Sequence, residues 1–459
     1  MRRPPVTRLE RNGLLLLTSQ AIVAGSGLVF WAVVARLYTS SEVGLAVALI
    51  NAAGLVAQAA VMGCNQAIVR FGTSLKPFER LLSTGLVMVL LSASVIGFLA
   101  VIVQHFRGGS PGEGMTWVVP VFLFACVMMP VNLVFDAAML VRNAVALNTV
   151  GYLIGSIARI ALVVLLVQLG YLGVLLAHAL SYFTTGLISA VHLARAGAYR
   201  PFAGVDLRTG RRLATFAASS HIAGLAWTAP TMLYPIIVMT VLGSASGAHL
   251  YMALSMASLL QMVALSASQS LFSEASVEPE RAVPLARRSL RVSLSVTAVA
   301  GLVLVVAGDV ILSAFGREYA AEGWLVLALL VPSQLIACVN LAANSIAKVR
   351  GELTGLLVRN LVGAGVSLSV TTAMLGQVGN VAVAWGVFAG QMVMVLANTN
   401  FVLQVLGRGR PPAKPPRAED RRAPDQAHRA TGSTRARRRH RNGPRRYRNV
   451  DSASKRWEL

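Results

Sequence analysis

Long apolar runs constrain this chain more than any other feature of its sequence. Twelve of them match the roughly 20 residues that a helix needs to cross the hydrocarbon core of a membrane. The runs are 13–35, 43–64, 82–104, 116–137, 148–168, 171–193, 213–241, 248–270, 292–314, 324–345, 355–375 and 380–405. They are continuous rather than alternating, which favours helices over a closed barrel. The sequence therefore predicts an all-α polytopic membrane protein with about 12 transmembrane helices.

The composition excludes the main alternative classes. Hydrophobic residues make up 55% of the 459 residues and charged residues only 13%, whereas a soluble domain carries about 25% charge. A soluble globular enzyme is therefore excluded, and so is disorder over most of the chain. Cys64, Cys126 and Cys338 lie in or beside apolar runs, and their odd number and wide separation argue against a disulfide framework or a zinc cluster.

Lysine and arginine are distributed unevenly between the predicted loops. If the N-terminus is cytoplasmic, the inside segments before the tail hold 19 basic residues and the outside loops hold three, namely Arg36, Arg107 and Arg317. Loops rich in Lys and Arg stay on the cytoplasmic side. We therefore expect a multi-pass protein of the cell inner (cytoplasmic) membrane with both termini in the cytoplasm.

Much of the net charge of +23 belongs to the C-terminal segment. Residues 407–459 carry 17 of the 41 Lys and Arg and a net charge of +12. The segment is rich in Pro and Arg and poor in apolar residues, so we expect a disordered basic cytoplasmic tail over 406–459. Its expected partner is anionic lipid, with roughly 1 kcal/mol per basic residue near the surface. A purely topogenic role stays open, and nucleic acid is not an expected partner.

The basic loop 194–212 divides the predicted helices six and six. Residues 1–193 would form an N-terminal six-helix lobe, the loop a cytoplasmic linker, and residues 213–405 a C-terminal six-helix lobe.

Internal similarity supports this division. Segment 37–56 matches 242–261 at 7 of 20 positions, and 142–155 matches 350–363 at 4 of 14, with offsets of 205 and 208. The nearly constant offset indicates a parallel repeat, as in transporters that rock two halves around a central site.

Short motifs lie in two parts of the chain. The stretch 36–71 contains Ser41-Glu42-Val43-Gly44 and then Gly63–Phe71 (GCNQAIVRF), and Phe315–Ala320 (FGREYA) precedes the tenth run. They resemble the "ARLLSPEEFG…LGLSQALIRF" and "FGPEYA" patterns of polysaccharide-biosynthesis flippases in the multidrug/oligosaccharidyl-lipid/polysaccharide (MOP) exporter superfamily. The resemblance covers about residues 10–405.

The resemblance implies a fold and a function. It implies two six-helix lobes around a V-shaped central cavity and alternating access without ATP hydrolysis. The implied cargo is an undecaprenyl-linked oligosaccharide or polysaccharide precursor, flipped from the cytoplasmic to the outer leaflet in polysaccharide or lipopolysaccharide biosynthesis. A glycan polymerase or glycosyltransferases would be partners.

Motifs for enzyme chemistry are missing from the sequence. It contains no G-x-x-x-x-G-K-[ST] and no H-E-x-x-H, and its seven histidines are scattered. We therefore expect no enzyme activity, no metal and no cofactor.

Arginines within the runs are the main candidates for binding the pyrophosphate of such a cargo. Arginine is permanently charged and binds phosphate in a bidentate manner, and an ionisable residue within a span is a functional candidate. Arg159 lies about twelve residues into run 148–168, and Arg359 lies one turn into run 355–375. The alternatives are that Arg159 pairs with Asp136 or that either side chain reaches the interface.

Other arginines lie at the ends of the runs. Arg70 and Arg142 are at cytoplasmic ends, where they could receive the headgroup or serve topology alone. Arg36 and Glu42 flank the first outer loop and are expected to pair with each other.

Asp136 and Asp309 are the acidic residues within the predicted runs, each near one end. They are candidates for proton or sodium coupling, with solvation at the interface as the alternative. Cation-coupled drug exporters of the superfamily generally carry an acid in the first or seventh span. Runs 13–35 and 213–241 contain none, which weighs against a drug exporter.

Run 213–241 is unusually polar. Pro230 and Pro235 predict either a hinge or a static kink. His221 and Trp227 are expected to line the cavity, with helix packing as the alternative. Gln20, Asn51, Gln58, Gln261 and Gln269 are expected to form hydrogen bonds between helices.

Three functions therefore stay open. The first is translocation of an undecaprenyl-linked glycan precursor across the cytoplasmic membrane. The second is a cation-coupled multidrug exporter of the same superfamily. The third is a non-transporting membrane scaffold for glycan-assembly enzymes, recruited through the basic tail.

Overall fold

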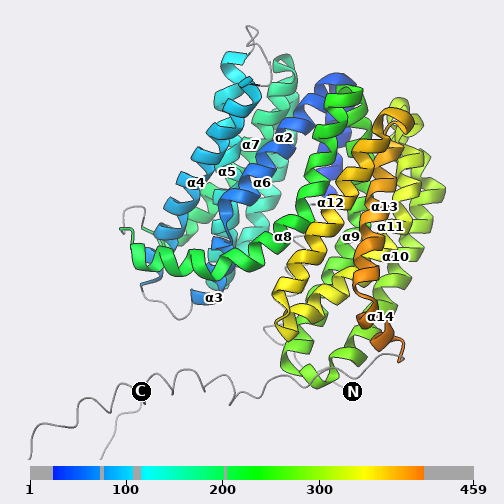
Figure 1. Cartoon of the computed structure of the whole chain (residues 1–459). Coiled ribbons are helices and arrows are strands. Elements are labelled where there is room, and N and C mark those ends of the chain that lie inside the picture. The colour runs from blue at the N-terminus through cyan, green and yellow to red at the C-terminus, as the bar shows by residue number, and fades with distance from the viewer. Residues whose placement is uncertain (1–23, 73–76, 107–114, 201–203, 408–459) are drawn as a thin grey trace, which may run out of the picture. The chain divides into compact units, whose positions relative to one another are not determined.

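The computed structural model describes residues 24–72, 77–106, 115–200 and 204–407, and these residues form helices joined by short turns (Figure 1). The elements are α2 (Ser40–Val61), α3 (Cys64–Phe71), α4 (Phe78–Phe106), α5 (Met115–Val141), α6 (Val145–Leu165), η1 (Val167–Leu169), α7 (Tyr171–Arg195), α8 (Leu207–Leu242), α9 (Ser244–Val277), η2 (Pro279–Arg281), α10 (Ala282–Ser313), α11 (Arg317–Arg350), α12 (Leu353–Val378), α13 (Val381–Ala397) and α14 (Thr399–Val405). A shorter helix, Ala24–Leu37, precedes α2. From residue 408 onward, the predicted tail lies outside the described residues.

Most of these helices have the length and composition of membrane spans. In the described residues, 10 helices are long and apolar enough to cross a membrane, and the bent pair α13 and α14 makes 11 if it forms one span. Helix Ala24–Leu37 covers the described part of the predicted run 13–35. Every predicted run therefore contains a helix, and the all-α polytopic membrane fold is confirmed.

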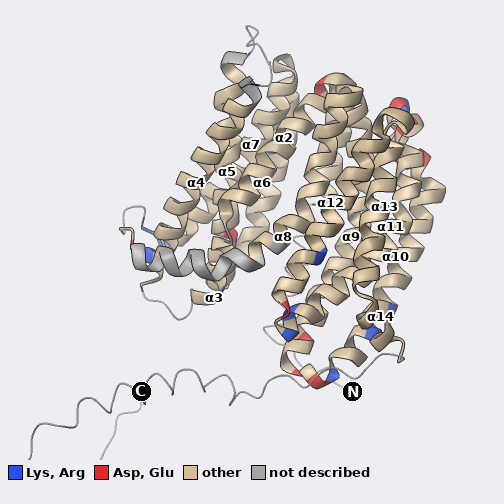
Figure 2. Ribbon diagram, viewed as in Figure 1, with Lys and Arg blue, Asp and Glu red and all other residues tan. Residues whose placement is uncertain are grey.

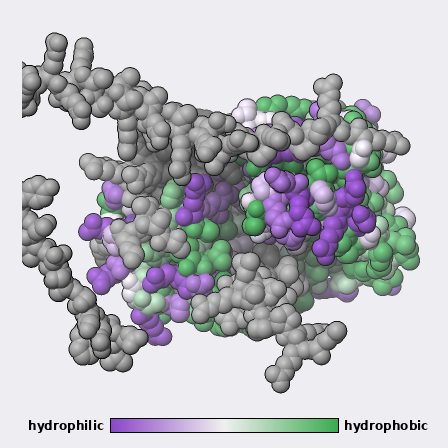
Figure 3. Space-filling view, turned by 90° about the horizontal axis from the view of Figure 1, so that it is seen from below, coloured by the Kyte–Doolittle hydropathy of each residue, from purple (hydrophilic) through white to green (hydrophobic). Residues whose placement is uncertain are grey.

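The surface of the described chain also has the pattern of a membrane protein. Charged residues gather at the two ends of the helices and are sparse between them (Figure 2). The side of α10 exposes a row of large apolar side chains, including Val299, Val303 and Val306. Seen from below, hydrophilic residues gather on the end of the helices, with hydrophobic residues around them (Figure 3). An apolar belt between two polar ends suits lipid contact along the sides.

Two predicted runs are interrupted. The run 43–64 breaks after α2, because Met62 and Gly63 adopt positive φ values of 45° and 74° before α3 begins. The run 380–405 bends by 69° between α13 and α14. At this bend the side chain of Asn398 donates to Asn340 Oδ1 at 3.2 Å, so a buried polar contact fixes the change of direction.

Helix positions repeat along the chain. The starts of α6 and α12 are Val145 and Leu353, which differ by the offset of 208 found in the sequence. Gly170 before α7 and Gly379 before α13 have nearly the same backbone angles, 55°/−141° and 62°/−144°. Both turns need a conformation that only glycine adopts readily.

Helices from the two halves pack mainly within their own half, and two helices join the halves. Helices α4 to α7 pack together, as do α9 to α13 (Figure 1). Helix α2 packs against both α5 and α9, whereas α8 packs against α3 and α4 at its start and against α9 and α12 further on. The predicted linker 194–212 is partly helical, because α7 continues to Arg195 and α8 begins at Leu207.

Hydrogen bonds join the two halves at one end of the helices. We call it the upper end after its place in Figure 1, and it contains segments 37–40, 242–244 and 313–317. The bonds are Arg36 Nε to Ala314 O (3.0 Å), Arg36 Nη2 to Ser313 O (3.1 Å), Ser40 Oγ to Glu318 Oε2 (2.7 Å) and Ser41 Oγ with Ser244 Oγ (2.6 Å). The halves are therefore held together at the upper end by neutral and charge-assisted contacts.

The predicted pair of Arg36 and Glu42 is wrong. Glu42 accepts hydrogen bonds from the backbone N–H and hydroxyl of Thr39 and completes a capping box at the start of α2. Arg36 instead binds backbone carbonyls of the other half. Burial, with a smaller effect of Glu42, raises the pKa of the nearby Tyr38, whose hydroxyl stays protonated and donates to Val163 O at 2.7 Å.

We predict that Gly44→Ala destabilises the upper end. A β-carbon at Gly44 would overlap the backbone carbonyl of Ser244, so α2 and α9 would have to move apart. The expected loss is about 1–3 kcal/mol, measured as a lower Tm of the purified protein. The matched control is Gly365→Ala in α12, where the β-carbon meets open space and the Tm should not fall. Equal Tm changes in both variants would contradict this packing.

Candidate functional site

Among the described residues, Arg159 lies within a cluster of aromatic side chains rather than beside an acid. Its Cζ is 4.5 Å from the centroid of the Phe30 ring, a cation–π geometry. Its Nε is buried and has no hydrogen-bond partner in the described part of the chain. Tyr182 of α7 and Tyr251 of α9 lie near the guanidinium of Arg159. We call Arg159 and these neighbouring aromatic residues the Arg159 site.

The Arg159 site contains side chains from both halves. Trp31 packs edge-on against Tyr251 with ring centroids 4.9 Å apart, so helix Ala24–Leu37 contacts α9 here. His178 of α7 is buried and packs against Tyr182 with centroids 5.2 Å apart. Because the surrounding groups are rings, the cation is held without being neutralised.

Asp136 does not pair with Arg159, so that alternative from the sequence is wrong. Its carboxyl group accepts hydrogen bonds from Asn148 Nδ2 at 3.0 Å and from the hydroxyl of Tyr152. Asn132 donates to the same hydroxyl at 3.1 Å, and Ser189 Oγ donates to Asn148 Oδ1 at 3.3 Å. Asp136 therefore anchors a polar network between α5, α6 and α7.

The other predicted charged residues lie apart from this network. Arg70 and Arg142 are exposed, and Arg142 Cζ lies 5.5 Å from the centroid of the Phe78 ring. Asp309 is exposed on α10. Arg359 is partly exposed on α12, and its Nε has no hydrogen-bond partner among the described residues.

The polar residues of α8 divide between two roles. His221 Nε2 donates to the backbone carbonyl of Gln58 at 2.6 Å, so it joins α8 to α2. Trp227 and Pro230 line a cavity within the C-terminal half, and Pro235 is buried one turn further along. Both prolines lie inside the continuous helix α8.

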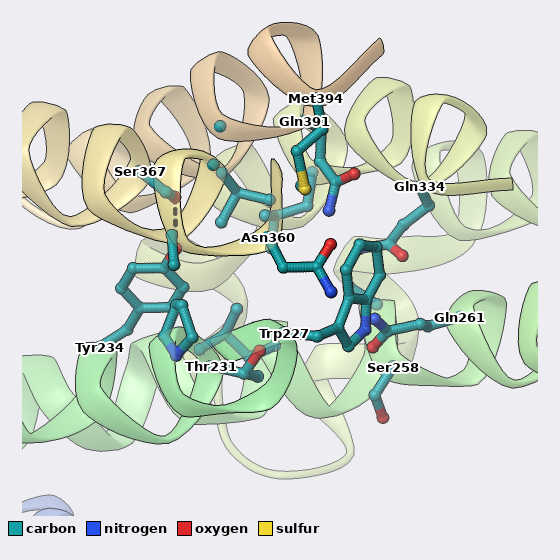
Figure 4. A pocket seen from close by; sticks show the side chains of 18 of the residues that line it. Trp227, Thr231, Tyr234, Ser258, Gln261, Gln334, Asn360, Ser367, Gln391 and Met394 are labelled. Atoms are coloured by element: carbon teal, nitrogen blue, oxygen red, sulfur yellow. Dashed lines mark hydrogen bonds between the residues drawn. The ribbon is translucent and has the colours of Figure 1, made fainter. Parts of the chain in front are cut away.

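The cavity contains about 690 Å³ of space not filled by atoms, part of it open to solvent. Helices α8, α9, α11, α12 and α13 supply its lining, and the polar side chains in it are Trp227, Thr231, Tyr234, Ser258, Gln261, Gln334, Asn360, Ser367 and Gln391 (Figure 4). None of the described lining residues is charged. Because four carboxamides are among them, we call it the carboxamide cavity.

Hydrogen bonds fix part of the lining of the carboxamide cavity. Asn340 Nδ2 donates to both the side-chain and the backbone oxygen of Gln391, at 2.8 and 2.9 Å. The hydroxyls of Tyr234 and Ser367 lie 2.5 Å apart. These contacts hold three lining residues in position.

Sequence reasoning missed most of this cavity. It singled out Trp227 and Gln261, but expected Gln261 to bond between helices, whereas Gln261 lines the cavity. Gln334, Asn360 and Gln391 carried no signal beyond being amides within apolar runs. The available clue was the recurrence of amides on helices of the C-terminal half. The sequence does not show which side of its helix each amide lies on relative to the neighbouring helices, because this depends on how the helices pack. No group of three or more His, Cys, Asp or Glu among the described residues could hold a metal ion.

Comparison with known proteins identifies the fold. No family model and no curated protein matches the sequence. The structure is similar to an inward-facing multidrug resistance MATE family transporter of the MOP superfamily, with a TM-score of 0.67 and 14% identity over 83% of this chain and 94% of the other. It is also similar to the lipid II flippase MurJ in an inward closed conformation, with a TM-score of 0.64 and 11% identity over 86% and 92%.

A third similar structure is a MOP superfamily transporter from Pyrococcus furiosus, for which reverse polarity of the binding pocket suggests a different function. Its TM-score is 0.59, with 13% identity over 89% of this chain and 97% of the other. The chain has the fold of MOP-superfamily transporters. All three of these neighbours are transporters or flippases.

We predict that Tyr152→Phe destabilises the N-terminal half. The change removes the hydroxyl that donates to Asp136 and accepts from Asn132. Each buried group left unsatisfied costs about 1–3 kcal/mol, so the Tm should fall by several degrees. The control is Tyr171→Phe, because the Tyr171 hydroxyl has no hydrogen bond in the described part of the chain. If Tyr152→Phe and Tyr171→Phe have the same Tm, the Asp136 network does not contribute to stability.

Proposed function

We propose that this protein flips a lipid-linked glycan precursor, an undecaprenyl-linked oligosaccharide or polysaccharide precursor, across the cytoplasmic membrane by alternating access. The observation that supports this most directly is the state of Arg159. In the described part of the chain, Arg281 pairs with Glu278 and His249 Nε2 lies 3.7 Å from Glu318, and neither contact includes Arg159. An anion from outside the protein is the natural partner of such a cation.

The energetic cost of Arg159 makes this argument quantitative. An arginine costs roughly 2.5–3.5 kcal/mol at the centre of a membrane helix and less toward its ends, and arginines within spans usually mark substrate pathways. Arg159 lies six residues from the end of α6, so this range is an upper bound for its cost. The Phe30 ring offsets part of this cost, because a cation over a ring gains about 0.5–2 kcal/mol. The planar guanidinium can bind two oxygens of a diphosphate at once. The cargo we propose supplies that group.

The position of the Arg159 site suits one end state of a transport cycle. Trp31 and Tyr251 lie six to seven residues from the upper ends of their helices, or about 10 Å along the axis. Directly above them, hydrogen bonds between the halves close the upper end. The sequence predicts that this end faces outward. We infer a state in which the headgroup reaches Arg159 from the cytoplasmic side.

Other residues receive roles within this proposal. Arg70 and Arg142, exposed at the predicted cytoplasmic ends, would attract the anionic headgroup, and Arg359 would extend the cationic path. Pro230 and Pro235 would let α8 bend as access changes, because proline removes backbone hydrogen bonds within a helix.

The expected partners follow from the same proposal. Anionic lipid would bind the basic tail, whose residues from 408 on lie outside the described part, and a glycan polymerase or glycosyltransferases would supply or consume the cargo. Both termini would face the cytoplasm.

The proposal predicts a specific defect in Arg159→Gln. Proteoliposomes would carry a fluorescent polyprenyl diphosphate bearing N-acetylglucosamine, and transfer between leaflets is read as accessibility to a membrane-impermeant quencher. Loss of a charge-assisted contact worth about 1.5–3 kcal/mol should slow transfer on the order of tenfold to a hundredfold. The control Arg281→Gln changes only an exposed ion pair and should match the wild type. Wild-type rates in Arg159→Gln would contradict the assignment.

A second candidate function is a cation-coupled multidrug exporter. Asp136 favours it, because a carboxyl group within a membrane helix bundle can exchange a proton or bind a cation. The absence of described charged residues from the carboxamide cavity gives a cationic drug no counter-charge there.

Deleting the gene separates the two candidate functions. Loss of a glycan with accumulation of its lipid-linked precursor supports flipping, whereas drug hypersensitivity with intact glycans supports export.

The scaffold hypothesis makes a different prediction. If the chain only recruits glycan-assembly enzymes through its tail, removal of residues 407–459 would abolish its function. A flippase should keep part of its activity after this truncation, because the Arg159 site lies entirely within the helices.

A further inference from the structure

The carboxamide cavity has a chemistry different from that of the Arg159 site. Its polar lining consists of amides, hydroxyls and one indole, and no charged residue is among the described residues that line it. Amides offer both donors and acceptors, whereas an ion would need opposite charge or a set of oxygen ligands. The cavity therefore suits a neutral ligand with many hydroxyl groups.

Part of the lining is available for such a ligand. Within the described chain, the carboxamide of Gln261 and the indole N–H of Trp227 have no hydrogen-bond partner, and Gln334 Oε1 is buried without one. Figure 4 shows Trp227, Gln261 and Gln334 converging around Asn360. A buried polar group without a partner is costly, so Gln334 Oε1 favours an occupant that bonds to it, and Gln261 and Trp227 offer further free groups beside it.

Trp227 adds a flat apolar surface beside these amides. A pyranose ring carries hydroxyls at its rim and C–H groups on its faces, so it can bond to amides with its edge while a face packs on an indole. Three other lining residues, Gln391, Tyr234 and Ser367, are held in place by hydrogen bonds. Lining residues that are held in place beside unpaired amides are the arrangement of a preorganised site.

Helix α9 connects the carboxamide cavity to the Arg159 site. Tyr251, Leu254, Ser258 and Gln261 are spaced by three, four and three residues, so they lie on one face of the helix. Tyr251 belongs to the Arg159 site, and the next three line the cavity. The cavity thus begins one turn from Tyr251 and extends to Gln261, about 15 Å along the axis.

We infer that the carboxamide cavity is a binding subsite for a neutral pyranose, the sugar attached to the diphosphate that Arg159 binds. This inference rests on the proposed function, and it assigns the two parts of one ligand to two chemically distinct sites. The charged part binds in the N-terminal half, and the neutral sugar binds among the amides of the C-terminal half.

A binding experiment tests the subsite without transport. The full chain in phospholipid nanodiscs is titrated with free glucose, galactose and N-acetylglucosamine, with tryptophan fluorescence as the readout and the acyclic polyol sorbitol as a control probe. We expect a saturable change with at least one pyranose. Gln261→Leu should weaken it at least roughly fivefold while keeping the reporter Trp227. Trp385→Phe, on the exposed side of α13, should bind like the wild type. No saturable response of the wild type, or an equal response to sorbitol, would overturn the inference.

A transport experiment separates the subsite from the proposed function. Proteoliposomes carry polyprenyl diphosphate either with or without N-acetylglucosamine. Gln261→Leu should slow the sugar-bearing lipid at least roughly fivefold more than the sugar-free lipid, whereas Arg159→Gln should slow both. If Gln261→Leu slows the transfer of both lipids equally, the cavity is not a sugar subsite, whereas the proposed flippase function is unaffected. If the wild type transfers neither lipid but still binds pyranoses, the proposed flippase function is wrong, whereas the assignment of the cavity as a pyranose-binding site is kept.

Discussion

The guanidinium of Arg159 over the ring of Phe30 is the contact on which the account of this protein depends. A permanent charge inside a helix bundle must be compensated, and here the described surroundings supply aromatic rings in place of a carboxylate. Rings stabilise the cation while leaving its N–H groups able to bind an anion. The aromatic residues come from both halves, so the same contact that stabilises Arg159 also lies where the halves meet. An anion bound there would touch the elements that must separate in a transport cycle.

The two halves share a similar arrangement of helices but carry polar side chains of different chemistry. At the offset of 208, Arg159 corresponds to Ser367 and Gly155 to Gly363. Gly155 and Gly363 both lie where a neighbouring helix, α7 or α13, approaches closely. Around this shared frame, the N-terminal half holds a cation and the Asp136 network, whereas the C-terminal half holds a neutral cavity. A duplicated scaffold that carries charge on one side and amides on the other suits a ligand with one charged and one neutral part.

The sequence predicted the spans well because apolar length is a direct consequence of membrane thickness. It also singled out Arg159 as a candidate, since a charge within a run stands out against its neighbours. Its errors concern contacts between helices. Glu42 caps its own helix rather than pairing with Arg36, and Asp136 bonds to Asn148 and Tyr152, because local and neighbouring partners were closer than the expected ones.

Amides were the least predictable group. Asn51 bonds to Val47 O of its own helix, Gln261 faces the carboxamide cavity, and Asn398 fixes the bend before α14. All three look alike in an apolar run, because a carboxamide can donate and accept in any of these settings. Their roles depend on which face of the helix meets a neighbour, and that is a property of packing rather than of local sequence.

Locking the upper end tests alternating access most directly. Ser41 Oγ and Ser244 Oγ lie 2.6 Å apart across the two halves, so Ser41→Cys with Ser244→Cys should form a disulfide in a background lacking Cys64, Cys126 and Cys338. If the Arg159 site must open toward both leaflets in turn, oxidation should stop lipid transfer in proteoliposomes and reduction should restore it. Transfer at the same rate in the oxidised and reduced protein would contradict the account.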